Sequence, residues 1–235
     1  MRQMDLTEGV IWKKLMIYAV PVILSSFLQS AYSITDLIVA GWFVGKGGIS
    51  AINNASQVML LLTQIIMGVT IGGSILMGQY YGAKDRENRV RTNHTLFSFS
   101  VLAGAAVMVV LFFTGGAILT ALKAPALIPA TEYLRICAVG LVPIFGYNAL
   151  ASMLRSVGNS RQPFVCVAIT AGSNILMDLL FMGAFRWGVA GAAWATVVAQ
   201  TASFVVCLIY VLRQNDLFGL GEGRLTIHGD KLLAC

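Results

Sequence analysis

Six long stretches that are almost free of charged residues limit what this chain can fold into more than any other feature. Asp178 is the only charge within them; the stretches are 15–35, 47–83, 95–122, 136–154, 162–185 and 187–212. A transmembrane helix needs about 20 apolar residues, so each stretch can cross a bilayer. The stretches are continuous, whereas the strands of a membrane barrel alternate in units of about 10 residues. The pattern predicts an all-α, polytopic membrane protein, a six-transmembrane-helix bundle.

Short loops, most of which contain Gly or Pro, separate the expected helices. The helices are predicted at 12–44, 50–81, 92–122, 127–155, 161–185 and 188–213. Together they form one transmembrane lobe, residues 1–213. Segment 214–235 carries charges and four glycines and cannot span a bilayer, so it is predicted to be a cytoplasmic tail.

The composition excludes several other classes of protein. Hydrophobic residues make up 57% of the 235 residues and charged residues only 11%, less than half of the ~25% that is usual in soluble domains. This ratio of hydrophobic to charged residues excludes a disordered chain, a nucleic-acid-binding module and a secreted disulfide scaffold. The cysteines form no metal-ligand pattern and are predicted to be buried apolar residues. They are Cys137, Cys166, Cys207 and Cys235.

The distribution of positive charge predicts how the chain lies in the membrane. If the N-terminus is cytoplasmic, 12 of the 16 Lys and Arg residues lie in cytoplasmic loops or ends. This excess satisfies the positive-inside rule. Trp12 then lies at the cytoplasmic boundary, and Trp42 and Trp187 lie at the outer one, as in an aromatic belt. We therefore expect a plasma-membrane protein, in a bacterial or archaeal inner membrane, with both termini cytoplasmic and membrane lipid around it.

Two acidic residues lie inside predicted membrane helices, where a carboxylate costs roughly 2.5–3.5 kcal/mol on insertion scales. Asp36 and Asp178 are each about two turns from the outer end of their helix. If the last two helices form a hairpin at Trp187, then Asp178 and Thr196 are equally far from the turn and share a depth. Asn174 lies one turn from Asp178 on the same helix face.

These side chains form a candidate site for reversible binding of a cation. Their oxygen atoms suit Na⁺, and burial also favours the protonated form of a carboxylate, so H⁺ is the alternative ion. Two close carboxylates would titrate as a coupled pair. Gln29, Tyr32 and Asp36 follow one polar stripe along the first helix. In the structural alternative, each Asp only caps or pins a helix through hydrogen bonds.

Prolines inside two predicted helices allow either a static kink or a hinge. A proline removes one backbone hydrogen bond and loosens the helix around it. Pro21 interrupts the first helix, and Pro143 interrupts the fourth. In the functional interpretation, Pro21 is a hinge that lets the stripe carrying Asp36 move.

Four segments resemble the multidrug and toxic compound extrusion (MATE) family, in that family's order and spacing. They are PVILSSFLQSAYSITDLIVAGWFVG (21–45), GQYYGAKDRENRV (78–90), LRSVGNSRQPF (154–164) and GVAGAAWATVVAQ (188–200). The resemblance runs from about residue 10 to residue 213. Members of the family are cation-coupled antiporters that expel organic, often cationic, drugs, and their fold has twelve helices in two six-helix lobes.

The resemblance implies roles for particular residues. The cation site of the family's first lobe falls on Asp36, Asn174, Asp178, Ala192 (through its carbonyl) and Thr196. If this chain is sodium-coupled, the resemblance implies that Na⁺ is held by Asp36, Asn174, Asp178 and Thr196. Pro21 falls on the proline whose bending is thought to follow protonation. Gln29, Tyr32 and Asn148 fall on positions that line the substrate cavity. No cofactor is implied besides the coupling ion, Na⁺ or H⁺.

The chain matches only the N-terminal lobe of that family, so several interpretations stay open. The first is a cation-coupled antiporter for organic cations that works by alternating access, as a half-size unit paired with itself or with a paralogous six-helix lobe. The others are an inactive or truncated half-transporter and a flippase for lipid-linked precursors from the same superfamily. An enzyme is not predicted, because His94, at the cytoplasmic edge of the third helix, and His228, in the tail, cannot reach a serine in the middle of the membrane. No nucleic-acid partner is expected.

Overall fold

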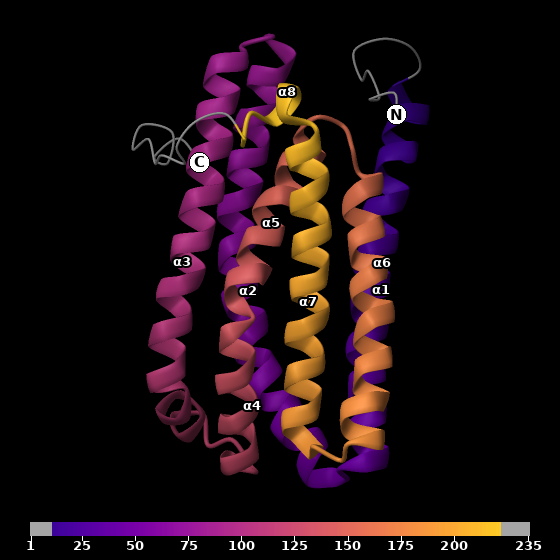
Figure 1. Ribbon diagram of the computed structural model, residues 1–235, viewed down its shortest axis with the longest axis vertical. Coiled ribbons are helices and arrows are strands. Elements are labelled where there is room, and N and C mark those ends of the chain that lie inside the picture. Colours follow the sequence, from indigo (N-terminus) through magenta and orange to yellow (C-terminus); the bar gives the residue numbers. More distant parts are fainter. Residues whose placement is uncertain (1–10, 222–235) are drawn as a thin grey trace.

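Long helices run side by side along one axis in this computed structural model, which describes residues 11–221 (Figure 1). The elements are α1 (Ile11–Phe43), α2 (Lys46–Gly82), α3 (Arg86–Ala121), α4 (Leu127–Val139), α5 (Leu141–Ser156), α6 (Arg161–Asp178), η1 (Leu179–Ala184), α7 (Gly188–Arg213) and α8 (Asn215–Phe218). Five spans are long and apolar enough to cross a membrane, and the bent pair α4 and α5 makes a sixth if it is counted as one span. The predicted all-α, six-helix architecture is confirmed.

Charged residues form the first turns of α3, which begins earlier than the apolar stretch predicts. The helix was expected at 92–122, but it starts at Arg86. Asp85 caps it, because its carboxylate oxygen accepts a hydrogen bond from the backbone N–H of Asn88 at 3.1 Å. Glu87 and Arg91, one turn apart, form an ion pair at 2.7 Å. Hydropathy marks the part of a helix that lies in lipid, whereas the cap determines where the helix begins.

The expected fourth helix is divided at Gly140 into α4 and α5, which meet at 48°. Pro143 lies in the first turn of α5, where its missing N–H disturbs no bond within that helix. The bend therefore precedes the proline, and Pro143 does not kink the interior of a continuous helix as the sequence suggested.

The expected fifth helix changes type directly after Asp178. Residues Leu179–Ala184 form η1, a π-helix, which is a form that often occurs at functional sites. Gly183 of η1 packs against the end of α1, because a Cβ at this position would lie only 3.0 Å from the ring of Phe43. The π-helix and the end of α1 are therefore in close contact.

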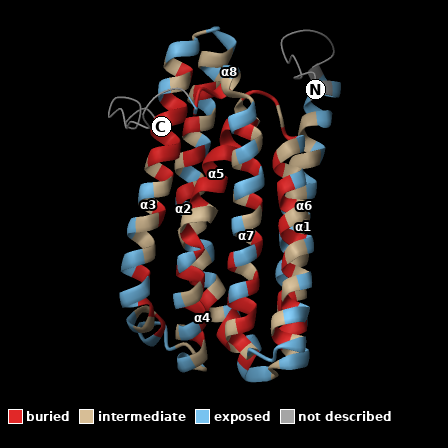
Figure 2. Ribbon diagram, in the orientation of Figure 1, coloured by how far each residue is buried: buried red, intermediate tan, exposed pale blue. Residues whose placement is uncertain are grey.

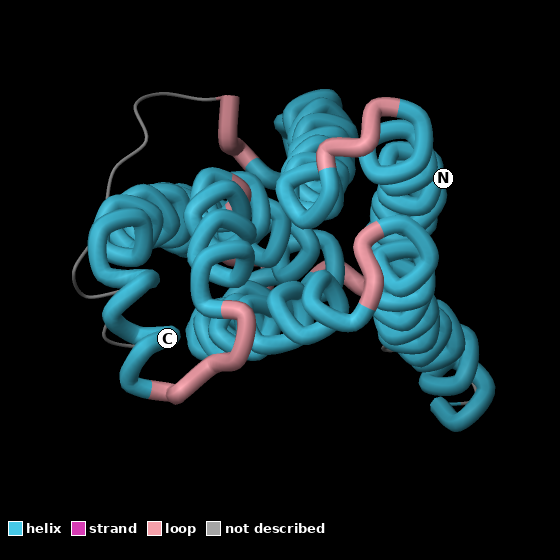
Figure 3. Tube along the Cα trace, turned by 90° about the horizontal axis from the view of Figure 1, so that it is seen from below, coloured by secondary structure: helices cyan, strands magenta, loops and turns pink. Residues whose placement is uncertain are grey.

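The packing of the helices leaves α1 at the edge of the lobe. α1 packs mainly on α6, while α7 packs on α6, α4 and α5. The view along the bundle shows the helices grouped around a shared interior (Figure 3). Exposed residues follow the outside of the long helices (Figure 2), and many are large and apolar, such as Phe27, Ile65 and Phe113. Such a surface is suited to lipid and would aggregate in water.

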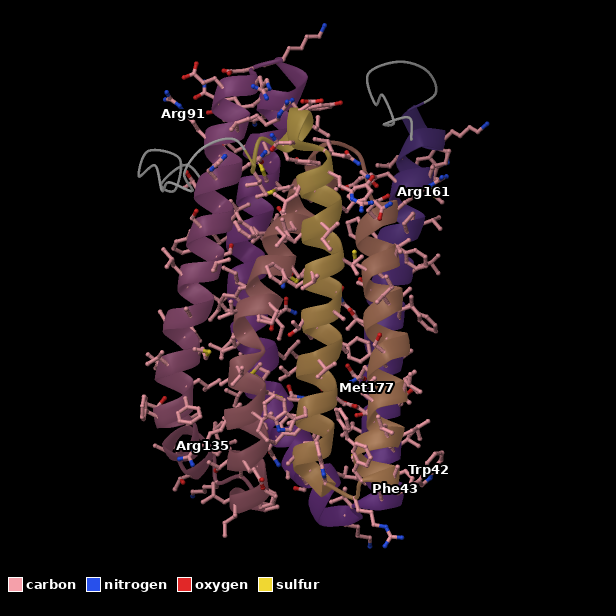
Figure 4. All side chains as sticks on the ribbon, viewed as in Figure 1. Trp42, Phe43, Arg91, Arg135, Arg161 and Met177 are labelled. Carbon is pink, nitrogen blue, oxygen red and sulfur yellow. The ribbon has the colours of Figure 1, made fainter. Side chains whose placement is uncertain are left out.

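The residues after α7 fold back onto α3. The side-chain amide of Asn93 donates to the carbonyl of Phe218 at 2.8 Å, and His94 Nε2 lies 2.8 Å from the carbonyl of Gly219. Phe218 itself is buried. Residues 214–221 of the predicted tail therefore belong to the lobe, whereas 222–235, with Cys235 and His228, lie outside the described residues. We call the end of the bundle where α1 begins and α7 ends the basic end; Arg91 and Arg161 are labelled there in Figure 4.

Candidate cation-binding site

The packing of α1 on α6 brings the two predicted membrane aspartates together. Asp36 of α1 faces both Asp178 and Asn174 of α6. All three side chains are buried, with exposures of 7% for Asp36, 0% for Asp178 and 1% for Asn174. Neither carboxylate faces lipid, and the two lie on different helices, as the sequence predicts.

The site lies in the half of the bundle away from the basic end. Met177, the residue before Asp178, is labelled in Figure 4 nearer to Trp42 than to Arg161. This depth agrees with the count of residues back from the turn at Trp187. The adjacent helices α6 and α7 are the hairpin on which that count depends.

Most polar side-chain atoms of these three residues are left without hydrogen bonds. One oxygen of Asp36, both oxygens of Asp178 and both polar side-chain atoms of Asn174 are buried and have no partner among the described residues. Buried polar groups in proteins are almost always hydrogen-bonded. A cluster with a purely architectural role would satisfy its own members. This cluster instead holds several unpartnered oxygens close together, and a small cation or a proton would stabilise such an arrangement.

Thr196 and Ala192 of α7 bond to each other. The hydroxyl of Thr196 donates to the carbonyl of Ala192 at 3.1 Å, as Thr commonly does in membrane helices. Ala192 is fully buried and Thr196 is half-buried. The hydroxyl oxygen of Thr196 keeps lone pairs for an ion, whereas the Ala192 carbonyl already accepts this bond. Of the two, Thr196 is the better ligand.

Tyr133 of α4 is a neighbour of the site that the sequence did not indicate. It is buried, its hydroxyl faces Ser56 and Thr196, and it is close enough to Asp36 to interact with it electrostatically. Gln200 was also missed; its amide donates to the hydroxyl of Tyr32 at 3.5 Å. Gln200 lies in a long apolar stretch, and Tyr133 lies between Glu132 and Arg135 near the start of its helix. In neither place does the sequence indicate which way the side chain points.

The other predicted residues occupy different surroundings. Gln29 is exposed on α1 and Tyr32 is half-buried. Asn148 is buried on α5, and its amide donates to the carbonyl of Ile144 at 2.8 Å. Asn148 is therefore held against its own helix, and only Gln29 faces outward from the lobe. Pro21 lies inside a continuous α1, and its carbonyl accepts a hydrogen bond from the hydroxyl of Ser25 at 2.7 Å.

The chemistry of the donor set fits a hard monovalent cation or a proton. Two carboxylates and an amide oxygen supply oxygen ligands, which alkali and alkaline-earth cations prefer. Across residues 11–221 there is no cluster of three or more His, Cys, Asp or Glu side chains of the kind that holds a transition metal. Cys137, Cys166 and Cys207 are buried and free, as the sequence predicts.

Comparison with protein families gives a match over most of the chain. The model of the MatE family matches residues 21–180. The protein YpnP of Bacillus subtilis (strain 168), described as a probable multidrug resistance protein, is 30% identical over 221 residues, which is 92% of this chain and 49% of YpnP. The chain therefore spans about half the length of the curated relatives it matches.

Solved transporters share the fold. A structure described as the outward-facing conformation of a multidrug resistance MATE family transporter of the MOP superfamily matches with a TM-score of 0.86 and 20% identity, over 94% of this chain and 50% of that one. A MOP superfamily transporter from Pyrococcus furiosus, described as having a binding pocket of reverse polarity that suggests a different function, matches with a TM-score of 0.88 and 20% identity, over 100% of this chain and 52% of that one. In both cases the six-helix bundle corresponds to half of a longer chain.

Proposed function

This chain belongs to the multidrug and toxic compound extrusion family, and from that premise we propose that it forms one lobe of a cation-coupled antiporter that exports organic, often cationic, drugs. The names of its relatives support drug export, since YpnP is described as a probable multidrug resistance protein. The observation that carries the proposal is the cluster of buried, unpartnered oxygens at Asp36, Asn174 and Asp178.

The basic end of the lobe faces the cytoplasm of a plasma membrane in this proposal. Twelve of the sixteen Lys and Arg residues lie in the loops and ends assigned to that side, in agreement with the positive-inside rule. The cation site then lies in the outer half of the membrane, where ions from outside the cell reach it.

The coupling ion, Na⁺ or H⁺, binds between α1 and α6 at Asp36 and Asp178, with Asn174 and Thr196 as neutral ligands. Without the ion, two negative carboxylates on different helices repel each other across a medium of low dielectric. With the ion, both are attracted to one positive charge, and α1 is drawn toward α6. Because the two positions of α1 differ in affinity for the ion, an ion gradient can drive the movement.

Pro21 is the hinge of this movement. α1 is the edge helix of the lobe and is held mainly by α6, so a change at its contact with α6 can shift it without disrupting the core. The proline lacks an N–H and leaves a carbonyl of the preceding turn without its helical bond. The segment between Pro21 and Asp36 then moves and changes access to a cavity lined by Gln29, Tyr32 and Asn148.

A second lobe covers the polar face of α1 and α2 in this proposal. Exposed polar residues lie along the middle of both helices: Ser26, Gln29, Ser30, Ser33, Gln57 and Gln64. Those of α1 and those of α2 are at similar distances from the turn that joins the helices, so they share a depth. Polar side chains at this depth are unfavourable against lipid. Another six-helix lobe, from the same or a different chain, would turn this face into one wall of a substrate cavity.

Drug export is favoured over lipid-precursor flipping by the charge of this face. The exposed polar residues of α1 and α2 are neutral, and the arginines and lysines lie toward the ends of the helices. A cavity for anionic lipid headgroups needs fixed positive charge. No enzymatic step is part of the proposal; His94 serves at the basic end, beside the carbonyl of Gly219.

Drug efflux from cells tests the role of the two aspartates. We expect Asp36→Asn and Asp178→Asn each to abolish efflux of a cationic dye, because each variant lacks one of the two carboxylates between which the ion binds. The matched control is Glu132→Gln, which removes an exposed acid of α4 outside the site. Unchanged efflux in both Asp variants would reject the mechanism.

Pairing is tested on the same preparation by native mass spectrometry in detergent. One chain has a mass of 25.2 kDa, and we expect a stable complex of two lobes in any sample that transports. A transport-competent sample containing only single chains would contradict the need for a second lobe. An inactive single chain that gains transport when a paralogous lobe is co-expressed would identify the partner.

A further inference from the structure

An open groove runs between α1 and the first turn of α6, near the basic end of the bundle. Four residues of α1 and one of α6 line it: Met16, Ile17, Val20, Pro21 and Arg161. Its volume is about 340 Å³. The wall on α1 is entirely apolar, and the only charged residue among the five is the arginine.

The groove opens toward the outside of the lobe. Met16, Ile17 and Val20 are all exposed. α1 is held in this orientation by Tyr18, whose hydroxyl donates to the carbonyl of Arg155 at 3.3 Å. The apolar wall therefore faces the space that lipid tails fill in a membrane.

Arg161 is an exposed cation at the rim of this wall. Within residues 11–221 no carboxylate forms an ion pair with it. Figure 4 shows Arg161 at the same end of the bundle as Arg91, next to the first part of α1. A guanidinium at the membrane boundary binds phosphate through forked hydrogen bonds.

We propose that the groove binds one anionic phospholipid, whose acyl chain lies against Val20 and Pro21 and whose phosphate pairs with Arg161. A zwitterionic lipid has an ammonium group as well, and the groove supplies no acid to pair with it. An organic cation would be repelled by Arg161. The combination of one cation and an apolar wall therefore selects a negatively charged lipid, and this binding requires no transport.

Native mass spectrometry of the full chain, released from micelles that contain equal amounts of phosphatidylglycerol and phosphatidylcholine, tests the site. We expect the unaltered chain to retain phosphatidylglycerol in preference to phosphatidylcholine. Arg161→Gln should weaken that retention about fivefold, the factor that one interfacial cation contributes. Val20→Trp, which fills the groove and keeps the charge, should weaken it as well. The matched control is Arg213→Gln, an exposed arginine at the same end of the bundle that does not line the groove.

Two results would overturn the proposal: equal retention of phosphatidylglycerol by Arg161→Gln and the unaltered chain, or an equal loss in Arg213→Gln, which would indicate a general effect of charge. Thermal unfolding of each variant shows that it is folded, and Ile17→Trp replaces Val20→Trp if the latter unfolds. Because the readout is lipid retention, its failure leaves the efflux test of Asp36 and Asp178 unaffected.

Discussion

Asp36 and Asp178 are expected to lower the stability of the lobe while they serve its proposed activity. Both are buried, and three of their four carboxylate oxygens have no hydrogen-bond partner among the described residues. Burying a charge without a partner costs free energy of folding. Residues kept at such a cost are typical of functional sites, where stability is given up for activity.

Replacing one of the two acids should therefore stabilise the lobe. We expect Asp178→Asn to raise Tm, by about 2–4 °C for each kcal/mol of repulsion removed in a domain of this size. The dependence of Tm on added NaCl or on pH should weaken in the same variant, because one of the two carboxylates of the ion site is lost. Thermal unfolding in detergent across a series of NaCl concentrations and pH values measures both effects. A lower Tm for Asp178→Asn, with Glu132→Gln unchanged, would show that the pair is architectural.

The meeting of these two residues could be predicted from the sequence, but their full surroundings could not. Counting back from the turn at Trp187 gives the depth of Asp178. Because a carboxylate in contact with lipid is energetically unfavourable, its side chain is expected to face the interior of the bundle. Depth does not give the rotation of a helix about its axis. Tyr133 was missed for that reason, since it becomes a neighbour of Asp36 only through the way α4 packs.

The helices of the lobe differ in how they are held, and α1 and α3 show the contrast. α1 has one proline and its main contact with a single helix, α6. The backbones of α3 and α5 approach closely, because a Cβ on Gly104 would lie 3.2 Å from both the carbonyl oxygen of Leu141 and the Cα of Val142. The proposed hinge at Pro21 requires that α1 can move on a core that stays tightly packed.

The hinge is tested by Pro21→Ala. The new N–H restores a helical hydrogen bond, and we expect α1 to become stiffer and efflux to fall. The dependence of Tm on the coupling ion should persist, because the ion site is intact. Efflux and thermal unfolding, measured on one variant, separate these two effects. Normal efflux by Pro21→Ala would mean that the proline is a static feature of α1.

The tight contact between α3 and α5 is tested by Gly104→Ala. The methyl group meets backbone atoms that cannot rotate away, so we expect a loss of about 1–3 kcal/mol, as for other overpacked sites. Gly172→Ala is the control, because a Cβ there meets nothing within 4 Å. Alanine raises helix propensity equally at both positions, so the difference in Tm isolates the packing. Equal Tm values for the two variants would contradict the predicted clash.

The sequence predicted the membrane-spanning helices well, but it did not predict the helix start, the helix break or the π-helix that depend on local backbone hydrogen bonds. Apolar length identifies a membrane helix whatever its exact ends are. The cap at Asp85, the break at Gly140 and the π-helix after Asp178 depend on single hydrogen bonds and on packing. The docking of Phe218 on α3 was missed because the residues after Arg213 are too polar to indicate a buried segment.

As a whole, the lobe exposes two kinds of surface. Most of its outside is apolar and suited to lipid, whereas the middle of α1 and α2 exposes neutral polar residues such as Gln57 and Gln64. Lipid suits the apolar surface but not the polar residues in the middle of α1 and α2. The proposed second lobe removes the conflict by enclosing the polar part.

The double variant Gln57→Leu with Gln64→Leu tests whether that face lines a cavity. We expect the lobe to fold with unchanged Tm and efflux of a cationic dye to fall, because the cavity loses hydrogen-bonding groups. Gln79→Leu, an exposed glutamine farther along the same helix, should leave efflux unchanged. If the double variant exports normally, the two glutamines do not contribute to substrate binding.

The π-helix after Asp178 makes the packing of this segment on α1 depend on the number of residues in it more than on their identity. A π-turn holds one extra residue, so the helix faces before and after it differ in phase by about 100°. Asp178 lies directly before η1, and Gly183, which contacts Phe43, lies near the end of η1. Deleting one residue between them would restore the regular period and rotate Gly183 away from Phe43 while Asp178 kept its orientation. Insertions and deletions here thus adjust the alignment of α1 with α6 independently of the carboxylate.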